Sequence, residues 1–138
     1  MSEADPAELI RAEYLARVGG PVCESVEEGR VRDFLMALDE PCDRMTGQPV
    51  PPLFLLTLGR TRRPQPSRGS AVNAGNDYEF LAPVYVGDQI TVSRSVLSVE
   101  PKEGKAGRMY LLLSQATYTN QRDEIVGYSR IRILRWGW

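Results

Sequence analysis

Side chains that could perform acid–base chemistry gather in one short stretch of this 138-residue chain. Asp39, Glu40 and Asp43 place three carboxylates close together, directly after an apolar segment. A carboxylate serves as a general base near neutral pH when burial raises its pKa, whereas a carboxylate at a helix end is more often solvated. The chain has no histidine, which is the usual base at neutral pH. We therefore assign no catalytic residue and keep Glu40 and Asp39 as candidates for test.

Positively charged side chains form a second group that could bind a ligand. The segment 60–70 is rich in Arg and Pro and has no apolar residue. It contains four arginines within a stretch of nine residues: Arg60, Arg62, Arg63 and Arg68. Guanidinium groups suit bidentate phosphate binding, so the phosphates of coenzyme A or of a phosphopantetheine arm are candidate ligands. The alternative is an ordinary exposed, solvated loop. We take the first three of these arginines as candidate substrate-binding residues.

Two asparagines and a glycine form a third group, at Asn73, Gly75 and Asn76. They are further candidates for substrate contact. The alternative is local turn geometry, because Asn and Gly accept positive φ angles and side-chain amides satisfy nearby backbone groups.

Helices are predicted where capping signals precede apolar residues at helical spacing. Asp5, followed by proline and a glutamate three residues after the cap, predicts a helix that ends near Val18. A capping box that starts at Ser25 predicts a second helix, whose residues 31, 34, 35 and 38 form one apolar face. The apolar run 53–58 predicts a short third helix.

Strands are predicted in the second half of the chain, which is rich in Val, Ile, Thr and Tyr. Short turns join them, so an antiparallel sheet is expected, and the 31–38 helix is expected to cover its apolar face. The fold class is α+β: a single domain over residues 1–138 with an N-terminal helical extension at 1–18. The predicted strands are 76–80, 89–99, 109–120 and 124–135.

Composition excludes several functional classes. The net charge is −1 and the pI is about 5.5, which argues against nucleic acid as the main partner. No apolar run is long enough to span a membrane, and no secretory signal is visible, so a cytoplasmic location is expected. Cys23 and Cys42 are expected to be free thiols, and no metal site is expected.

A longer motif points to a family. The run from Asn73 to Asp88, with Pro83 and Gly87, resembles the core signature of the MaoC-like enoyl-CoA hydratases and 3-hydroxyacyl thioester dehydratases. The resemblance covers about Gly19 to Arg135. It implies a hot-dog fold, in which a curved antiparallel sheet wraps around a central helix. Family members carry an Asp-x4-His catalytic dyad.

The dyad is where this chain departs from the family. Glu40 falls where the aspartate would be and Met45 where the histidine would be, with one residue of uncertainty that also admits Asp39. Only Thr46-Gly47-Gln48 separates Met45 from the next proline, whereas dyad-bearing members have a longer segment there. By resemblance the chain is a non-catalytic, acyl-binding subunit.

The resemblance also implies the partners. A second MaoC-like subunit with an intact Asp-x4-His would supply catalysis, in a heterodimer or a dimer of heterodimers. The substrate would be a fatty, steroid-derived or polyketide acyl thioester of coenzyme A or of phosphopantetheine, with no other cofactor. The C-terminal Trp136-Gly137-Trp138 is either part of such an interface or a tail folded onto its own core.

Two other functions remain open at this stage. One is a self-sufficient homodimeric hydratase or thioesterase that uses Glu40 or Asp39. The other is a non-enzymatic module that binds an acyl-CoA or an acyl-carrier protein.

Overall fold

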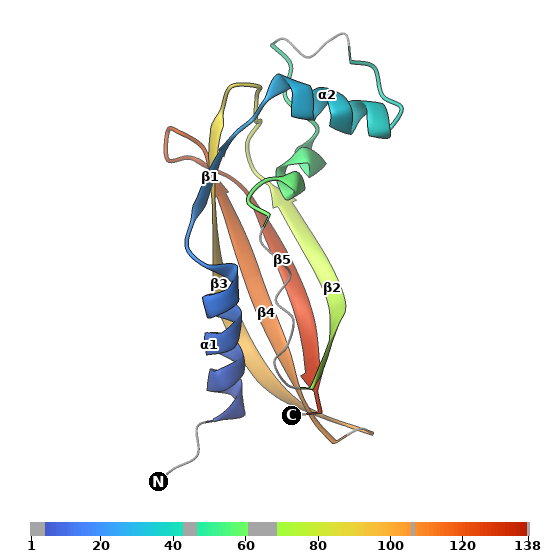
Figure 1. Cartoon of the computed structure of the whole chain (residues 1–138), viewed down its shortest axis with the longest axis vertical. Coiled ribbons are helices and arrows are strands. Elements are labelled where there is room, and N and C mark those ends of the chain that lie inside the picture. Colours follow the sequence, from blue (N-terminus) through green and yellow to red (C-terminus); the bar gives the residue numbers. More distant parts are fainter. Residues whose placement is uncertain (1–4, 43–46, 61–68, 106, 138) are drawn as a thin grey trace.

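One antiparallel sheet organises the molecule (Figure 1), whose computed structural model describes residues 5–42, 47–60, 69–105 and 107–137. The strand order is β1-β3-β4-β5-β2, so β1 and β2 are the two edges. The strands are β1 (Val22–Ser25), β2 (Ser70–Phe80), β3 (Gln89–Gly104), β4 (Gly107–Thr119) and β5 (Ile125–Trp136). The predicted α+β class and the antiparallel sheet are confirmed.

Residues of β4 alternate between a covered and an open face of the sheet. From residue 109 to residue 119 of β4, even-numbered residues are buried and odd-numbered ones are half-buried, which is the period of two that a strand produces. We call the side to which the even-numbered residues point the covered face. It includes Tyr110, Leu112, Ser114, Ala116 and Tyr118.

The first helix, α1 (Pro6–Val18), begins and ends as predicted. The Asp5 side chain accepts a hydrogen bond from the backbone N–H of Ala7 at 3.1 Å, which caps the helix. The helix lies alongside β3 (Figure 1) and buries Ile10, Tyr14 and Val18. These side chains form one apolar cluster with Val96, Tyr110 and Leu112 of the sheet.

The second helix, α2 (Glu28–Ala37), starts later than the predicted capping box. Ser25 cannot cap it, because this residue lies in β1 and pairs with Gln89. The strand β1 was missed, since four residues give too short a pattern to recognise. Glu27 holds the N-cap position without a side-chain cap.

The helix α2 does not cover the length of the sheet, which corrects the prediction from its apolar spacing. It lies beyond one end of the sheet (Figure 1), and only Val31 is fully buried, while Leu38 is 53% exposed. Phe34 packs edge-to-face on Phe54, with ring centroids 5.6 Å apart. The residues that cover the sheet come instead from α1 and from the 3₁₀ helix η1 (Pro52–Thr57).

The 3₁₀ helix η1 confirms the short helix predicted at 53–58. It anchors the second apolar cluster of the covered face, in which Phe54 and Leu55 are almost fully buried. The other members from the sheet and from α2 include Val31, Ile90, Val92, Ala116, Tyr118 and Val126. The covered face therefore carries two apolar clusters, one under η1 and one under α1.

The four predicted strands are all present, and three of them are longer than predicted. β2 begins at Ser70 rather than at residue 76, and β3 continues to Gly104. Strand pairing extends both beyond their local apolar patterns: β2 pairs with β5 from Ser70 to Phe80. None of the described helices is long and apolar enough to cross a membrane. Cys23 and Cys42 are free thiols.

Candidate functional site

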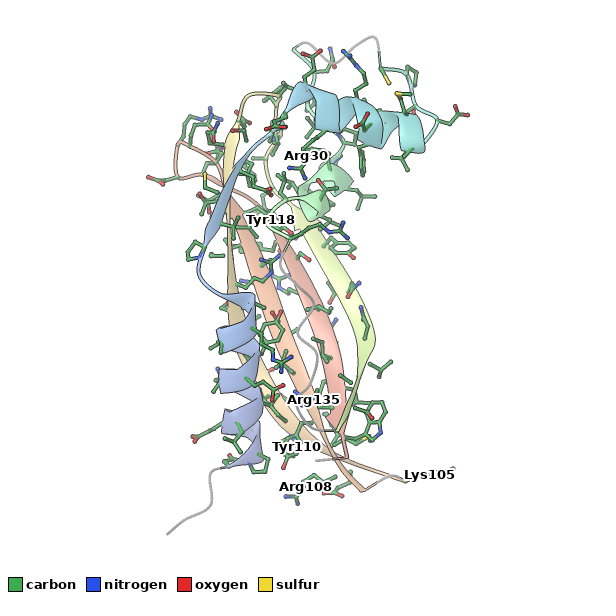
Figure 2. All side chains as sticks on the ribbon, viewed as in Figure 1. Arg30, Lys105, Arg108, Tyr110, Tyr118 and Arg135 are labelled. Atoms are coloured by element: carbon green, nitrogen blue, oxygen red, sulfur yellow. The ribbon has the colours of Figure 1, made fainter. Side chains whose placement is uncertain are left out.

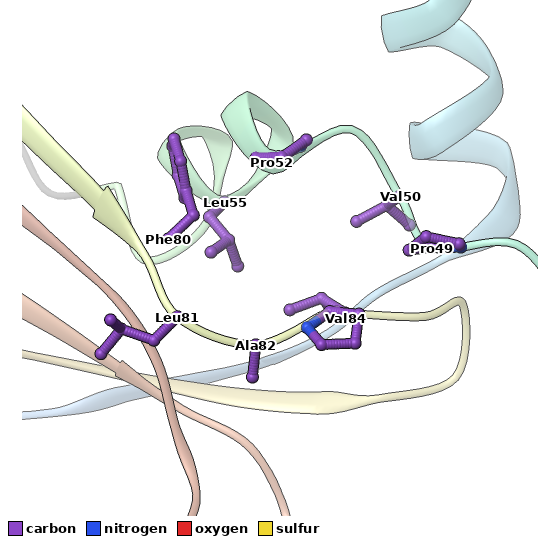
Figure 3. Close-up of a pocket in the computed structure, with 9 residues that line it drawn as sticks. Pro49, Val50, Pro52, Leu55, Phe80, Leu81, Ala82 and Val84 are labelled. Carbon is purple, nitrogen blue, oxygen red and sulfur yellow. The ribbon is translucent and has the colours of Figure 1, made fainter.

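An apolar cavity of about 320 Å³ opens between η1 and the segment that follows β2 (Figure 3). Leu55 of η1 and Phe80 of β2 lie side by side at one end of it, and Pro49 and Val50 lie at the other. None of the described residues that line the cavity is titratable. The full lining is Pro49, Val50, Pro52, Leu55, Phe80, Leu81, Ala82, Pro83 and Val84.

Local sequence explains why both walls of the cavity are ordered. Proline at residue 52 begins η1 with its φ angle already set, and the Pro51 carbonyl accepts the first bond, from the Phe54 N–H at 2.9 Å. The other wall is tied to the sheet, because the Leu81 N–H donates to the Val126 carbonyl at 2.9 Å. A hydrogen bond from the Val50 N–H to the Val84 carbonyl, at 2.7 Å, joins the two walls.

The turn after the cavity is held by the buried carboxylate of Asp88. Its oxygens accept hydrogen bonds from the Tyr85 backbone N–H and from the Gln121 side chain, each at 2.9 Å. Gly87 has a φ of 97°, in the region that favours glycine. The Pro-x3-Gly-Asp part of the motif therefore shapes the turn that leads into β3.

The candidate bases lie outside this cavity. Asp39 has a φ of 58° and follows the end of α2. Its N–H donates to the Met36 carbonyl at 3.1 Å and the Glu40 N–H donates to the Leu35 carbonyl at 2.9 Å, which is the Schellman pattern of a helix C-terminus. Both carboxylates are exposed. Asp39 thus has a structural role in ending the helix, and neither carboxylate is buried.

The histidine-equivalent position and most of the arginine group cannot be placed. Met45, Arg62, Arg63 and Arg68 lie outside the described residues. Arg60 is described and is exposed, just after η1.

The segment that contains Asn73, Gly75 and Asn76 forms a β-bulge on the edge strand β2. Strand pairing with β5 shifts between Asn73 and Gly75. The Asn73 Oδ1 accepts from the Gly75 N–H at 2.8 Å, and its Nδ2 donates to the Asn76 Oδ1 at 3.1 Å. These bonds match the local, backbone-satisfying alternative.

A row of polar residues crosses the covered face, two residues along β2 from the cavity residue Phe80. It was not predicted from the sequence. Strand register aligns Arg94 of β3 with Ala116 of β4, Ala116 with Ser129 of β5, and Ser129 with Tyr78 of β2. We call these four residues the polar row. The sequence did carry a signal for this row. Val92, Arg94 and Val96 point to the same face of β3, because side chains alternate along a strand, and a buried strand would carry an apolar residue at position 94.

Tyr118 (labelled in Figure 2) belongs to the apolar cluster under η1 and lies two residues after Ala116 of the polar row, on the same face of β4. Burial raises the pKa of Tyr118, and a hydrogen-bonding interaction with Ser129 and the charge of Arg94 act in the opposite direction on that pKa. Arg94 is therefore close enough to act on this hydroxyl. Among the described residues there is no cluster of three or more Cys, Asp or Glu side chains that could hold a metal ion.

Comparison with known proteins gives a family match. Residues 16–128 match the family model described as "FAS1-like, dehydratase domain region". A search of curated proteins found no match.

Solved structures share the fold at low sequence identity. The chain is similar to a chain of the ChsH1-ChsH2 complex from Mycobacterium tuberculosis, with a TM-score of 0.69, 15% identity, and coverage of 94% of this chain and 93% of that chain. It is similar to a MaoC-like dehydratase from Rhodospirillum rubrum, with a TM-score of 0.64, 17% identity, and coverage of 86% and 90%. It is also similar to the HadBC 3R-hydroxyacyl-ACP dehydratase complex from Mycobacterium tuberculosis, with a TM-score of 0.61, 16% identity, and coverage of 82% and 90%. The hot-dog fold expected from the motif is thus confirmed.

Proposed function

The chain belongs to the family of FAS1-like dehydratase domain regions, and on this premise we propose that it is the non-catalytic, acyl-binding subunit of a heteromeric enoyl-thioester hydratase or dehydratase. The observation that carries the proposal is the chemistry of the cavity. Its described lining is wholly apolar, which suits an acyl chain, and it offers no group that could move a proton. The two candidate carboxylates are exposed at the end of α2, away from that lining.

Addition of water to an enoyl thioester requires a base that takes a proton from water and an acid that protonates the α-carbon. This chain has no histidine for either task. We propose that a partner chain with the Asp-x4-His dyad supplies both, while this chain binds the acyl group. The substrate thioester would be one of coenzyme A or of phosphopantetheine.

The edge strand β2 supports a partner chain at the cavity. Its outer side has no strand neighbour among the described residues, and such an edge is usually covered in a native assembly. Four large side chains on or next to this edge are 39–51% exposed: the apolar Val72, Phe80 and Leu81, and the ring of Tyr78. Two of them, Phe80 and Leu81, also line the cavity. A partner that pairs along β2 would therefore close the cavity as well as the edge. Two of the structurally similar chains come from complexes, ChsH1-ChsH2 and HadBC.

The test is hydration of enoyl-CoA substrates, followed by the loss of enoyl-thioester absorbance. The purified chain should be inactive alone and active when co-expressed with a hot-dog protein that carries Asp-x4-His. Replacing the partner's dyad histidine by alanine should abolish the activity. Glu40→Gln and Asp39→Asn in this chain should leave it within about twofold, because exposed carboxylates contribute little to a remote reaction.

Two results would contradict the proposal. Activity of the chain alone, lost in Glu40→Gln, would establish a self-sufficient enzyme. A stable pair that binds acyl-CoA but never hydrates it, with an intact dyad, would indicate a binding module.

A further inference from the structure

The polar row places a charged side chain and two hydroxyl groups on the covered face, which also carries the two apolar clusters. Above it, Val92, Tyr118, Gly127 and Phe80 form the neighbouring row of the covered face, by the same strand register. Below it, the next row consists of Val96, Ser114, Ile131 and Asn76, and it leads to the apolar cluster under α1. An acyl chain that runs from the cavity along the sheet would therefore meet three polar side chains partway.

The distance from the cavity to the polar row follows from strand geometry. Phe80 lines the cavity, and Tyr78 is two residues earlier on the same strand and the same face. Two residues of a strand span about 7 Å, since each residue rises about 3.3–3.4 Å. Tyr78 thus lies within reach of a chain whose first atoms occupy the cavity. Arg94 is three strands further across the sheet, about 14 Å from Tyr78 between backbones, and its long side chain shortens that span.

Among the described residues, Arg94 has no carboxylate partner, whereas two other arginines of the sheet have one. Arg130 pairs with Glu79 at 3.3 Å and Arg132 pairs with Asp77, both on the open face. Arg94 is half-buried on the covered face, and among the described residues no carboxylate lies within ion-pair distance of it. A half-buried guanidinium group is favoured by a bound anion that offers two oxygen acceptors.

The hydroxyl groups around Arg94 suit the same ligand. Ser129 and Tyr78 lie in the polar row, and Tyr118 is adjacent to it. Each hydroxyl can donate one hydrogen bond, and a carboxylate accepts several at once. A guanidinium group with several hydroxyl donors is thus complementary to a carboxylate rather than to a plain alkyl chain.

We propose that the polar row binds a carboxylate on the acyl chain of the substrate, so that this subunit selects acyl thioesters with a second acid group. The inference rests on the proposed acyl-binding function of the same face. Arg94 is a specificity-determining residue in this proposal and takes no part in the hydration step. The competing explanation is that the stem of Arg94 merely covers apolar surface while its head group is solvated.

The test is direct binding, so that it does not depend on hydration. Isothermal titration calorimetry would compare octanoyl-CoA with the mono-CoA thioester of octanedioic acid, which has the same chain length and a terminal carboxylate. A third probe, the ω-hydroxyoctanoyl thioester, has an uncharged oxygen at that end. Each probe is titrated into the chain alone and into its pair with the dyad-bearing protein.

We expect the carboxylate probe to bind about tenfold or more tightly than octanoyl-CoA, which is the range for one charge-assisted pair. Arg94→Gln should remove this preference and leave octanoyl-CoA binding within about twofold, while Arg94→Lys should keep part of it. The matched control is Arg122→Gln, at the exposed turn before β5. This variant removes the same charge and should change neither affinity.

Several outcomes would overturn the inference. They are equal binding of the carboxylate and octanoyl probes, an equal loss for both in Arg94→Gln, a hydroxyl probe that binds as tightly as the carboxylate, or no binding of any probe. Failure of the proposed function looks different. A pair that never hydrates enoyl-CoA, yet keeps an Arg94-dependent preference for the carboxylate probe, would refute only the catalytic assembly.

Discussion

The buried hydrogen bond between Ser114 and Tyr14 is the polar contact by which α1 can be tested as a cover of the sheet. The Ser114 hydroxyl donates to the Tyr14 hydroxyl at 2.7 Å, and the two residues are only 2% and 9% exposed. Tyr14→Phe removes one partner and leaves the Ser114 hydroxyl buried without it. Such a loss costs about 1–3 kcal/mol, because the remaining polar group has left water without compensation.

The double variant should cost less than the sum of the two single ones. Ser114→Ala leaves the Tyr14 hydroxyl unpaired at a similar cost, whereas Tyr14→Phe with Ser114→Ala removes both polar groups together. We expect a coupling free energy of about 1–2 kcal/mol. At an m-value of about 2 kcal/mol/M, a single variant that loses about 2 kcal/mol shifts its urea midpoint by about 1 M.

The measurement is the free energy of unfolding in urea for the wild type and the three variants at one fixed protein concentration, because assembly would otherwise shift the midpoints. Tyr85→Phe is the control: this tyrosine is 38% exposed, and the change should stay within about 0.5 kcal/mol. Single-variant losses that add to within about 0.3–0.5 kcal/mol in the double variant would refute the contact. Proteolysis within α1 would show whether the helix alone detaches.

Three further changes test other parts of the structure. Asp39→Gly should raise the free energy of unfolding by about 0.5 kcal/mol, since glycine accepts the φ of 58° more easily. It should leave the hydration activity of the pair unchanged, and a loss of that activity would give Asp39 a catalytic role. Gly59→Ala should lower the free energy of unfolding by about 2–4 kcal/mol, because the added Cβ would lie 2.6 Å from the Val92 Cβ and the φ of Gly59 is 61°. The control is Gly20→Ala, whose added Cβ would meet nothing within 4 Å. Because burial raises the pKa of Tyr118 above 10.0, the unfolded chain releases this proton first. Stability should therefore fall as the pH rises above about 10, and the fall should be smaller in Tyr118→Phe; equal pH profiles in urea unfolding would contradict this.

Local patterns predicted the elements that depend on neighbouring residues. The cap at Asp5 predicted where α1 begins, and the Val, Ile, Thr and Tyr content between turns predicted β4 and β5 to within two residues at each end. Short or irregular elements were not predicted from the sequence. β1 has four residues, and its role comes from pairing with β3, which lies far along the chain.

The candidate site divides in the same way. The absence of histidine is a property of the sequence, and together with the family resemblance it already predicted a chain without a catalytic base. The exposure of Glu40 could not be predicted from the sequence, because burial depends on what packs against a residue from elsewhere in the chain. The sequence reading also treated Asn73, Gly75 and Asn76 as possible ligands, and only their pairing with β5 placed them in a bulge.

By itself, the sequence determined the α+β class, most of the strands, the family signature and the lack of a histidine, since all of these depend on residue types and short-range spacing. The tertiary structure decided which helices cover the sheet. The apolar spacing of α2 was sound, yet its side chains pack on η1 at the end of the sheet, and α1 covers the other part. It also decided that Arg94, Ser129 and Tyr78 fall in one row across the sheet, because strand register aligns positions 94, 129 and 78, and no local pattern encodes that register.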